Sequence, residues 1–383
     1  MPRLAILACA LAASLVMAPA VAADAAPRAR AFAQLETLVA QAAPQDTPTF
    51  EGWLRRDELF GVEARGAARA RHDGFQTGEA QALIWTYYDP VSVQHLHRHR
   101  LNEPTGLRAL RRGGATTNAE GDPTIPPLPD GATIVLTVWW PVATDRPTAL
   151  PVWDPEANPP LKDGNHYLTW KRVVAIDPDP APPAAATTPV ELVGRGWPAA
   201  NRVGLAAFPH RPVDAALAAE IARDPDARKA AVIALGRTVH AGDQLALVAM
   251  HAITKQQGRW SWTTLWWHDQ PTRGEFAQNR PASLRGAWRN FLLDTLPGDA
   301  PDETRPCFNP WLEARFPDEG FGGGTASNCL ACHRRASHPA VRFLPAVRRA
   351  QADTSDPALA RGQLGTDFLW SVARGARHAN AAR

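Results

Sequence analysis

Alternating apolar and polar positions predict β-structure in the middle of this chain. Residues 132–142 carry a large apolar side chain at every second position, a period that is typical of a strand with a buried face. These positions are Ile134, Leu136, Val138 and Trp140. Residues 244–253 and 260–268 repeat the pattern on either side of residues 255–258, which end in glycine. The two segments therefore predict a β-hairpin whose turn lies at residues 255–258.

Other patterns predict the elements around this hairpin. Asp89 followed by Pro90 is typical of a helix start, with aspartate as N-cap and proline at the first helical position. This helix is expected to run to about Arg100. Further strands are predicted over 81–88 and 167–176, further helices over 27–43, 213–222, 226–235 and 357–376, a long ordered loop over 144–165 and a linker over 177–189.

The first 22 residues are predicted to be a secretory signal. Arg3 supplies a positive charge, residues 4–16 are apolar, and small residues occupy positions 20–22 before the expected cleavage site. An uncleaved anchor is the alternative. No later segment has the roughly 18 consecutive apolar residues of a transmembrane helix, so we expect a soluble periplasmic protein without an integral membrane segment.

Composition narrows the possible partners. The chain of 383 residues has a net charge of +3, so its overall field does not call for a nucleic-acid partner. Hydrophobic residues make up 45%, as in a packed globular protein.

The cysteine count argues against a plain disulfide framework. Of four cysteines, Cys9 falls in the predicted signal, and the remaining three are an odd number.

One short string predicts chemistry. Cys329, Cys332 and His333 form the pattern Cys-x-x-Cys-His, in which two thiols can bond to the two vinyl groups of one haem. The histidine that follows then coordinates the iron. The string predicts one covalent haem c on Cys329 and Cys332, with His333 as metal ligand. The alternatives are a redox disulfide, a zinc site completed by Cys307 and His338, or chance.

On this string the sequence resembles the mono-haem c-type cytochromes. The resemblance covers residues 329–333 and implies covalent haem and electron transfer. The common small members take a methionine ligand from further along the chain, whereas no methionine follows His333 here. The second ligand must come from upstream, or the iron must have an open site.

A weaker resemblance is to the hydroxylamine-oxidising cytochromes with a lysine-cross-linked haem and to the β-type cytochromes c-prime. Residues 128–135 resemble their strand entry, and residues 367–370 resemble an element that follows their haem motif. No lysine matches the cross-linking position. The resemblance implies an antiparallel β domain with the haem motif near its end.

Together these observations predict an α+β fold, with a mainly antiparallel β core, flanking helices and a C-terminal haem-binding segment. The expected division is a signal peptide over 1–22, a β-rich globular domain over 23–300, and a haem c-binding segment over 301–383 packed on it.

His251 is the predicted second metal ligand. Met250 and His251 are adjacent on a predicted strand, so their side chains point to opposite faces, and only one can face a haem. His251 shares its face with the tryptophans of the hairpin, and a hairpin closing near residue 256 places it opposite Trp262. Met250 and His268 are the alternatives, while His338 is too close to His333 in sequence to reach the other side of the same haem.

Several other groups have a structural and a functional interpretation. His95, His97 and His99 suit a solvated basic helix better than a metal site, because on a helix only His95 and His99 align. Tryptophans 139–140 and 260–267 could wall a haem, anchor a core or bind a sugar. Cys307 is expected to be a small buried residue. The arginines that follow the haem motif suit a solvated face, haem propionates or an acidic partner.

Electron transfer to a redox partner protein is the predicted function. The alternative is a haem enzyme or small-ligand-binding protein with an open distal site, acting on a small nitrogen compound or a peroxide. In that case Asp269, Glu275 and Glu313 are the candidate acids or bases. A third hypothesis treats the tryptophan-rich region upstream as a binding module.

Overall fold

The computed structural model describes residues 20–40, 48–61, 82–117, 121–154, 167–179, 187–278, 280, 282, 284–297, 307–313, 328–334, 336–339 and 363–373. Within helices and strands, the side chains of residues 20–27 and 331–332 are not described.

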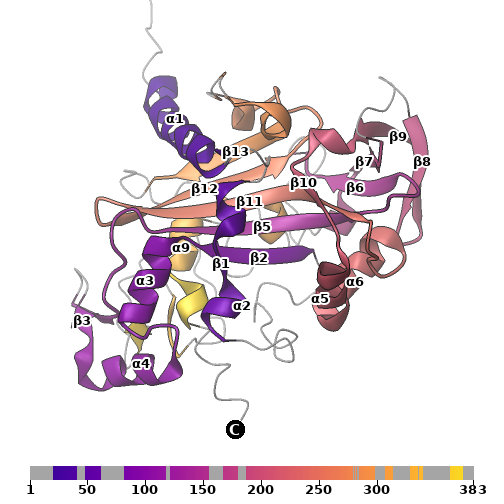
Figure 1. The fold of residues 1–383 in the computed structure, drawn as a ribbon. Helices are drawn as coiled ribbons and strands as arrows, with labels where there is room; N and C mark the ends of the chain where they lie inside the picture. Colours follow the sequence, from indigo (N-terminus) through magenta and orange to yellow (C-terminus); the bar gives the residue numbers. More distant parts are fainter. Residues whose placement is uncertain are drawn as a thin grey trace, which may run out of the picture.

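A seven-stranded antiparallel sheet forms the centre of the protein (Figure 1). Its strands follow the order β1-β2-β5-β11-β12-β13, and β10 pairs with β11. Their bounds are β1 Leu54–Arg55, β2 Leu83–Tyr88, β5 Thr133–Val142, β10 His210–Pro212, β11 Gln244–Gln256, β12 Arg259–Trp267 and β13 Phe291–Leu296. The predicted α+β class with a mainly antiparallel core is confirmed.

The central hairpin closes with a tighter turn than expected. Gln257 and Gly258 both have positive φ, at 50° and 74°, and form a two-residue loop between β11 and β12. His251 is therefore paired with Thr264, not with Trp262 as predicted. The error is two residues, which is one full period of a strand, so His251 and Trp262 still share a face.

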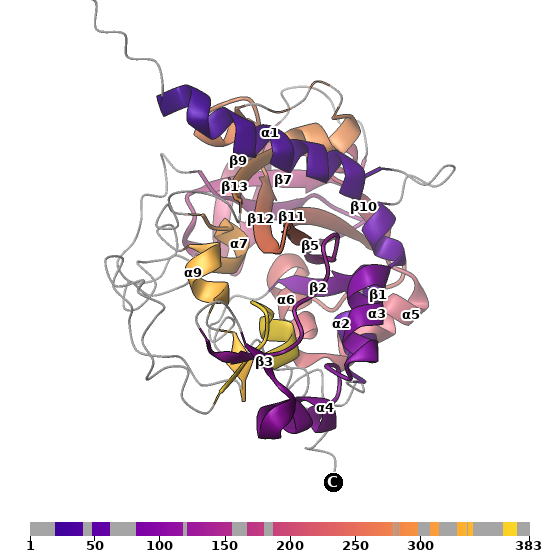
Figure 2. The same cartoon turned by 90° about the vertical axis from the view of Figure 1, so that its left-hand side faces the viewer.

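The two faces of the sheet are covered by different parts of the chain (Figure 2). Helix α1 (Ala20–Leu38) lies across one face, where Gln34 bonds to the side chains of Thr254 and Thr263. The opposite face carries a buried group that we call the C-terminal cluster. Its members include Ile253, Trp260, Trp262, Cys307, Cys329, Leu330, Leu364 and Leu369.

Two smaller sheets flank the central one. The first has the order β6-β7-β9-β8, with bounds Thr148–Val152, Arg172–Asp177, Arg195–Gly204 and Thr187–Leu192. The second has the order β14-β15-β4-β3, with bounds Ser337–His338, Leu364–Gly365, Pro123–Thr124 and Thr116–Thr117. The second sheet pairs β15, near the end of the described residues, with β4, which precedes β5.

Most predicted helices are present. Helix α3 (Pro90–Arg98) begins after Asp89, whose carboxylate accepts a hydrogen bond of 2.8 Å from the Ser92 amide. Helices α5 (Ala215–Arg223) and α6 (Pro225–Leu235) break at Asp224, which caps α6. The other α-helices are α2 (Arg56–Leu59), α4 (Pro104–Ala109), α7 (Pro310–Glu313) and α9 (Cys329–His333).

The short helical elements lie mostly between strands. They are η1 (Thr49–Gly52), η2 (Leu110–Gly114), η3 (Tyr167–Thr169), η4 (Leu205–Ala207), η5 (Glu275–Ala277) and η6 (Gly286–Asn290).

Three local predictions are wrong. The expected loop over 144–165 contains β6, and the expected linker over 177–189 overlaps β8. The expected helix over 357–376 is helical, among its described residues, only at 370–373, because β15 and a turn precede it. Strand pairing replaced the local preference in each case: β6 pairs with β7, β8 pairs with β9 across the turn at Val193-Gly194, and β15 pairs with β4. Strands β9, β10 and β13 and the two-residue strands β1, β3, β4 and β14 were also not predicted.

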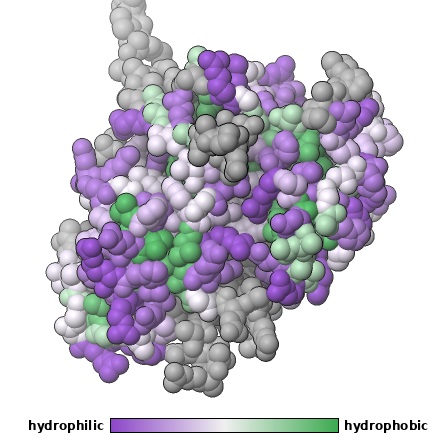
Figure 3. Space-filling view, viewed as in Figure 1, coloured by the Kyte–Doolittle hydropathy of each residue, from purple (hydrophilic) through white to green (hydrophobic). Residues whose placement is uncertain are grey.

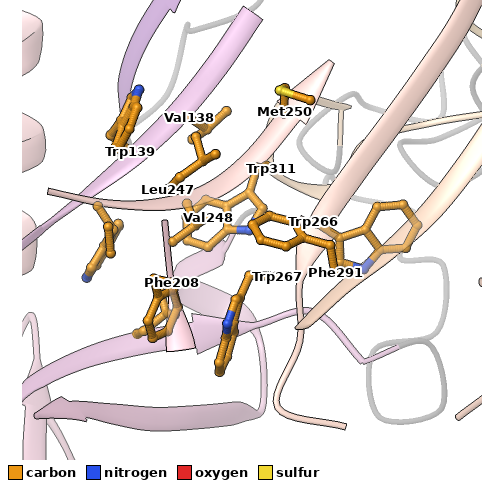
Figure 4. Close-up of a cluster of buried hydrophobic side chains, with 14 of the residues drawn as sticks. Val138, Trp139, Phe208, Leu247, Val248, Met250, Trp266, Trp267, Phe291 and Trp311 are labelled. Carbon is orange, nitrogen blue, oxygen red and sulfur yellow. The ribbon is translucent and has the colours of Figure 1, made fainter. Parts of the chain in front are cut away.

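A large cluster of buried side chains, many of them aromatic, includes residues of β5, β11, β12 and β13 and forms the main core, which we call the aromatic core (Figure 4). Trp139, Trp266, Trp267 and Met250 are all within it. Hydrophilic residues cover much of the surface in Figure 3, with small apolar patches between them. None of the helices in the described ranges combines the length and the hydropathy that crossing a membrane would require.

Candidate functional site

Two histidines that are far apart in sequence meet in the C-terminal cluster. His333 lies on the short helix α9, and His251 lies on β11 in the centre of the sheet. Their ring centroids are 6.0 Å apart, and the ring planes differ by 29°. His251 was predicted as a partner of His333 because of its face on the strand, and the fold places the two side by side.

A backbone carbonyl orients the His333 ring. Its Nδ1 lies 2.8 Å from the carbonyl oxygen of Phe368, which can only accept a hydrogen bond, so Nδ1 carries the proton. The lone pair of the neutral ring is then on Nε2. Metal-binding histidines are commonly held in this way by a second group. The Trp262 ring also packs against His333, at 5.8 Å between centroids.

His251 is buried as a neutral imidazole. Only 7% of its surface is exposed, and its Nδ1 has no hydrogen-bond partner. Burial, followed by the nearby charge of His333, lowers the pKa of His251 from 6.5 to about 3. A buried polar atom without a partner costs about 1–3 kcal/mol. The unpartnered Nδ1 of His251 therefore destabilises the folded protein, and a group that bound this nitrogen would offset the loss.

A buried ion pair fixes the segment that orients His333. The Asp367 carboxylate accepts hydrogen bonds from Lys255 Nζ at 2.7 Å and from the Leu128 amide at 2.8 Å. Asp367 and Phe368 both have positive φ, at 46° and 67°, which side-chain-bearing residues rarely adopt. The ion pair therefore holds the strained backbone whose carbonyl bonds to His333.

The sequence analysis did not identify Lys255 as part of the site. It was assigned to the turn, whereas it is the second-last residue of β11. With the turn at Gln257-Gly258, alternation places Lys255 on the same face as His251. Gly258 was the available signal, because glycine favours the positive φ of a two-residue hairpin loop. A loop at Gln257-Gly258 would have assigned Lys255 to the strand.

Cys329 begins helix α9 and lies against Cys307. The two Sγ atoms are 3.3 Å apart, and the Cys329 thiol also donates to the Cys307 carbonyl oxygen at 3.1 Å. The hydrogen bond with Cys307 and then burial raise the pKa of Cys329 well above its usual value. Cys332 lies on the same helix, but its side chain is outside the described set. Cys307 is fully buried, as predicted.

The described residues are compatible with a haem between the two histidines. Two imidazoles that bind one metal ion from opposite sides, with metal–nitrogen distances of about 2 Å, have centroids roughly 6 Å apart. The observed centroid separation is 6.0 Å, and His251, with its buried unpartnered nitrogen, and His333, with its oriented ring, are residues that would hold an iron. The thiol of Cys329 lies on the helix that carries His333.

The alternative second ligands lie elsewhere. Met250 packs in the aromatic core on the opposite side of β11. His268 is at the far end of β12, where its Nδ1 accepts a hydrogen bond of 2.9 Å from the Gln270 amide. His338 lies on β14 and contacts the Ala373 carbonyl oxygen. Of these histidines and Met250, His251 is the residue found against His333.

The three candidate carboxylates differ in their surroundings. Asp269 forms a two-point ion pair with Arg172, and Glu275 is exposed on η5. Glu313 accepts a hydrogen bond from the Asn309 amide, and burial raises the pKa of Glu313 to about 8. Glu313 also acts electrostatically on Cys329, so of the three it is the one associated with the site.

The tryptophan clusters divide between core and site. Trp139, Trp140, Trp266 and Trp267 belong to the aromatic core, whereas Trp260 and Trp262 belong to the C-terminal cluster. The indole nitrogens of Trp260 and Trp262 are buried without hydrogen-bond partners. Trp260 and Trp262 are therefore the tryptophans of these two groups that belong to the cluster containing Cys329 and Leu330 of α9.

The other possible metal ligands do not gather. His95 and His99 align on α3, with centroids 4.5 Å apart, as the helical spacing predicted. Throughout the described ranges, no group of three or more histidine, cysteine, aspartate or glutamate side chains is placed to hold a metal ion.

Comparison of this chain with protein-family profiles, with curated proteins and with solved structures gives no match.

Proposed function

We propose that this protein is an exported mono-haem c-type cytochrome that transfers single electrons in the periplasm. Cys329 and Cys332 would attach the haem, and His333 and His251 would hold its iron, which would supply the one-electron chemistry. The observation that carries the proposal is the pairing of the Cys-x-x-Cys-His histidine with a buried neutral histidine, 6.0 Å away, on the central sheet. A redox partner protein of the periplasm is proposed to exchange the electrons.

The residues of the chain would keep the site rigid. His251 lies in the middle of a strand that is paired on both sides, and His333 is fixed by the Phe368 carbonyl. Trp262 packs against His333 and Phe368, at 5.8 and 6.0 Å between centroids, and excludes water from that side. A site held in this way would change its structure little when the iron is oxidised or reduced, as rapid electron transfer requires.

The ligand pair sets the expected potential. A bound haem supplies the one-electron chemistry, and its potential depends on the axial ligands and their hydrogen bonds. A methionine ligand raises the potential, but Met250, the methionine of β11, is in the core on the opposite face of the strand from His251. We therefore expect a potential below that of cytochromes with a histidine and a methionine ligand.

Optical spectroscopy of the mature protein tests the proposal. The protein should be produced in a periplasm that has haem-maturation machinery and examined in both oxidation states, with and without carbon monoxide. The expected result is covalent haem with a low-spin spectrum that carbon monoxide does not change. The matched control is the variant Cys329→Ser/Cys332→Ser, which should contain no covalent haem.

Each other result has a distinct meaning. Absence of covalent haem in the wild-type protein contradicts the proposal. A high-spin spectrum that shifts with carbon monoxide contradicts the ligand role of His251 and supports an open iron site. A charge-transfer band of a methionine–iron bond would assign Met250 as the ligand instead.

A further inference from the structure

Cys307 and Cys329 are placed to react with one another. Their Sγ atoms are 3.3 Å apart, a distance at which two thiols are in contact but not bonded. Cys307 is fully buried, and Cys329 is 5% exposed. Backbone pairing between Cys307 and Asn328 brings the two segments together, so the contact does not depend on one side-chain rotamer.

We propose that Cys307 and Cys329 form a disulfide in the haem-free exported chain, and that this disulfide competes with haem attachment at Cys329. This inference rests on the proposed function, which places the chain outside the cytoplasm and supplies the haem that competes for Cys329. The disulfide itself requires no haem. Cys329 has one sulfur, which can be bonded to haem or to Cys307 but not to both.

The reaction is an ordinary thiol–disulfide exchange. A periplasmic protein disulfide or a small-molecule disulfide is the oxidant. The Cys307 and Cys329 thiols lose two protons and two electrons as one sulfur–sulfur bond forms between them. The oxidant takes up both as its own sulfur–sulfur bond breaks and gives two thiols.

The position of Cys307 is fixed by contacts that do not involve helix α9. Two residues after Cys307, the Asn309 side-chain amide donates to the Thr264 hydroxyl at 2.8 Å and lies 3.2 Å from the Leu265 carbonyl oxygen. Both partners belong to β12 in the central sheet. Cys307 is thus held at the sheet beside the place that Cys329 occupies.

Burial makes the outcome persistent. A disulfide is broken when an external thiolate attacks one of its sulfurs, so its lifetime depends on access. Cys307 is fully buried and Cys329 is 5% exposed, so external thiols reach either sulfur poorly once the segment is packed. Whichever bond forms first at this sulfur is expected to remain.

Disulfide mapping of the haem-free chain tests the proposal. The full chain is exported without haem-maturation machinery, quenched in acid, alkylated with N-ethylmaleimide and digested without reduction. Mass spectrometry should find a peptide pair linked through Cys307. The link should remain in Cys332→Ser and disappear in Cys329→Ser, which distinguishes the two cysteines of the motif.

The competition is measured separately in cells that attach haem. Cys307→Ser, which keeps a small side chain at this buried position, should increase the fraction of chains with covalent haem by roughly twofold or more. The proposal is overturned if Cys307 is alkylated in the haem-free chain, if it is linked to Cys332, or if Cys307→Ser leaves haem loading unchanged. Absence of haem from the wild type would instead contradict the proposed function and leave the disulfide map readable.

Discussion

Lys255 Nζ lies 2.7 Å from Asp367 Oδ1, and both side chains are more than nine-tenths buried. The ion pair joins the end of β11 to a segment 112 residues further along the chain. It also stands next to the site, because Asp367 precedes Phe368, whose carbonyl orients His333. The Lys255 ammonium lies over the Trp260 ring as well, 5.1 Å from its centroid.

Lys255→Met is expected to destabilise the protein strongly. Removing the lysine leaves the Asp367 carboxylate buried without its countercharge, which costs about 3–5 kcal/mol. Denaturant unfolding measures the loss. Lys229→Met is the matched control, because Lys229 is exposed on α6 and its loss should change the free energy of unfolding by less than about 0.5 kcal/mol. Equal stability of Lys255→Met and wild type would show that the pair does not hold the segment.

His251→Ala is expected to open the iron site. The haem should stay attached through the two cysteines, whereas the spectrum should become high-spin and respond to carbon monoxide. Added imidazole should restore the low-spin spectrum. His268→Ala, which changes a buried histidine at the far end of the same hairpin, should leave the spectrum unaltered. A low-spin, carbon-monoxide-inert His251→Ala protein would remove His251 as a ligand.

Glu313 is expected to make the protein less stable as the pH rises. Burial raises the pKa of Glu313 from 4.5 to about 8 in the folded state. Its stabilising contribution is fully present below about pH 4.5 and is lost progressively between pH 4.5 and 8, because in this window the unfolded state has released the proton and the folded state has not. The free energy of unfolding should fall by up to about 1.4 kcal/mol per pH unit in this window.

Glu313→Gln should remove that part of the pH dependence. Unfolding of wild type and variant would be compared at pH 5, 6.5 and 8, and the difference between them should change steadily across the series. Glu275→Gln is the control, because Glu275 is exposed. Parallel pH profiles for wild type and Glu313→Gln would show that this carboxyl is ionised normally.

Trp262→Leu is expected to loosen the site. Trp262 is fully buried and packs on both His333 and Phe368, so the smaller side chain leaves a cavity beside the ring. Large-to-small changes of this kind cost about 3–5 kcal/mol when most of the side chain is lost, and leucine should cost part of that. Thermal unfolding measures the effect. Trp197→Leu on β9, where the ring is only half-buried, should cost less.

Local patterns determined much of the fold. The alternation over 132–142, the Asp89-Pro90 helix start and the break between α5 and α6 all appear where the sequence predicted them. These signals are local, because a strand period or an N-cap depends on residues a few positions apart. The opposite faces of Met250 and His251 follow from the same alternation.

Strand alternation selected the face that carries His251, but the tertiary structure decided the other neighbours of the site residues. The hairpin register depends on a two-residue turn, and it determined that Lys255 belongs to the strand. The contacts of His333 with His251, of Asp367 with Lys255 and of Cys307 with Cys329 join segments that the sequence separates by 22 to 112 residues. Such contacts depend on how whole faces pack, and side-chain type and spacing along the chain do not encode which distant partner a face will meet.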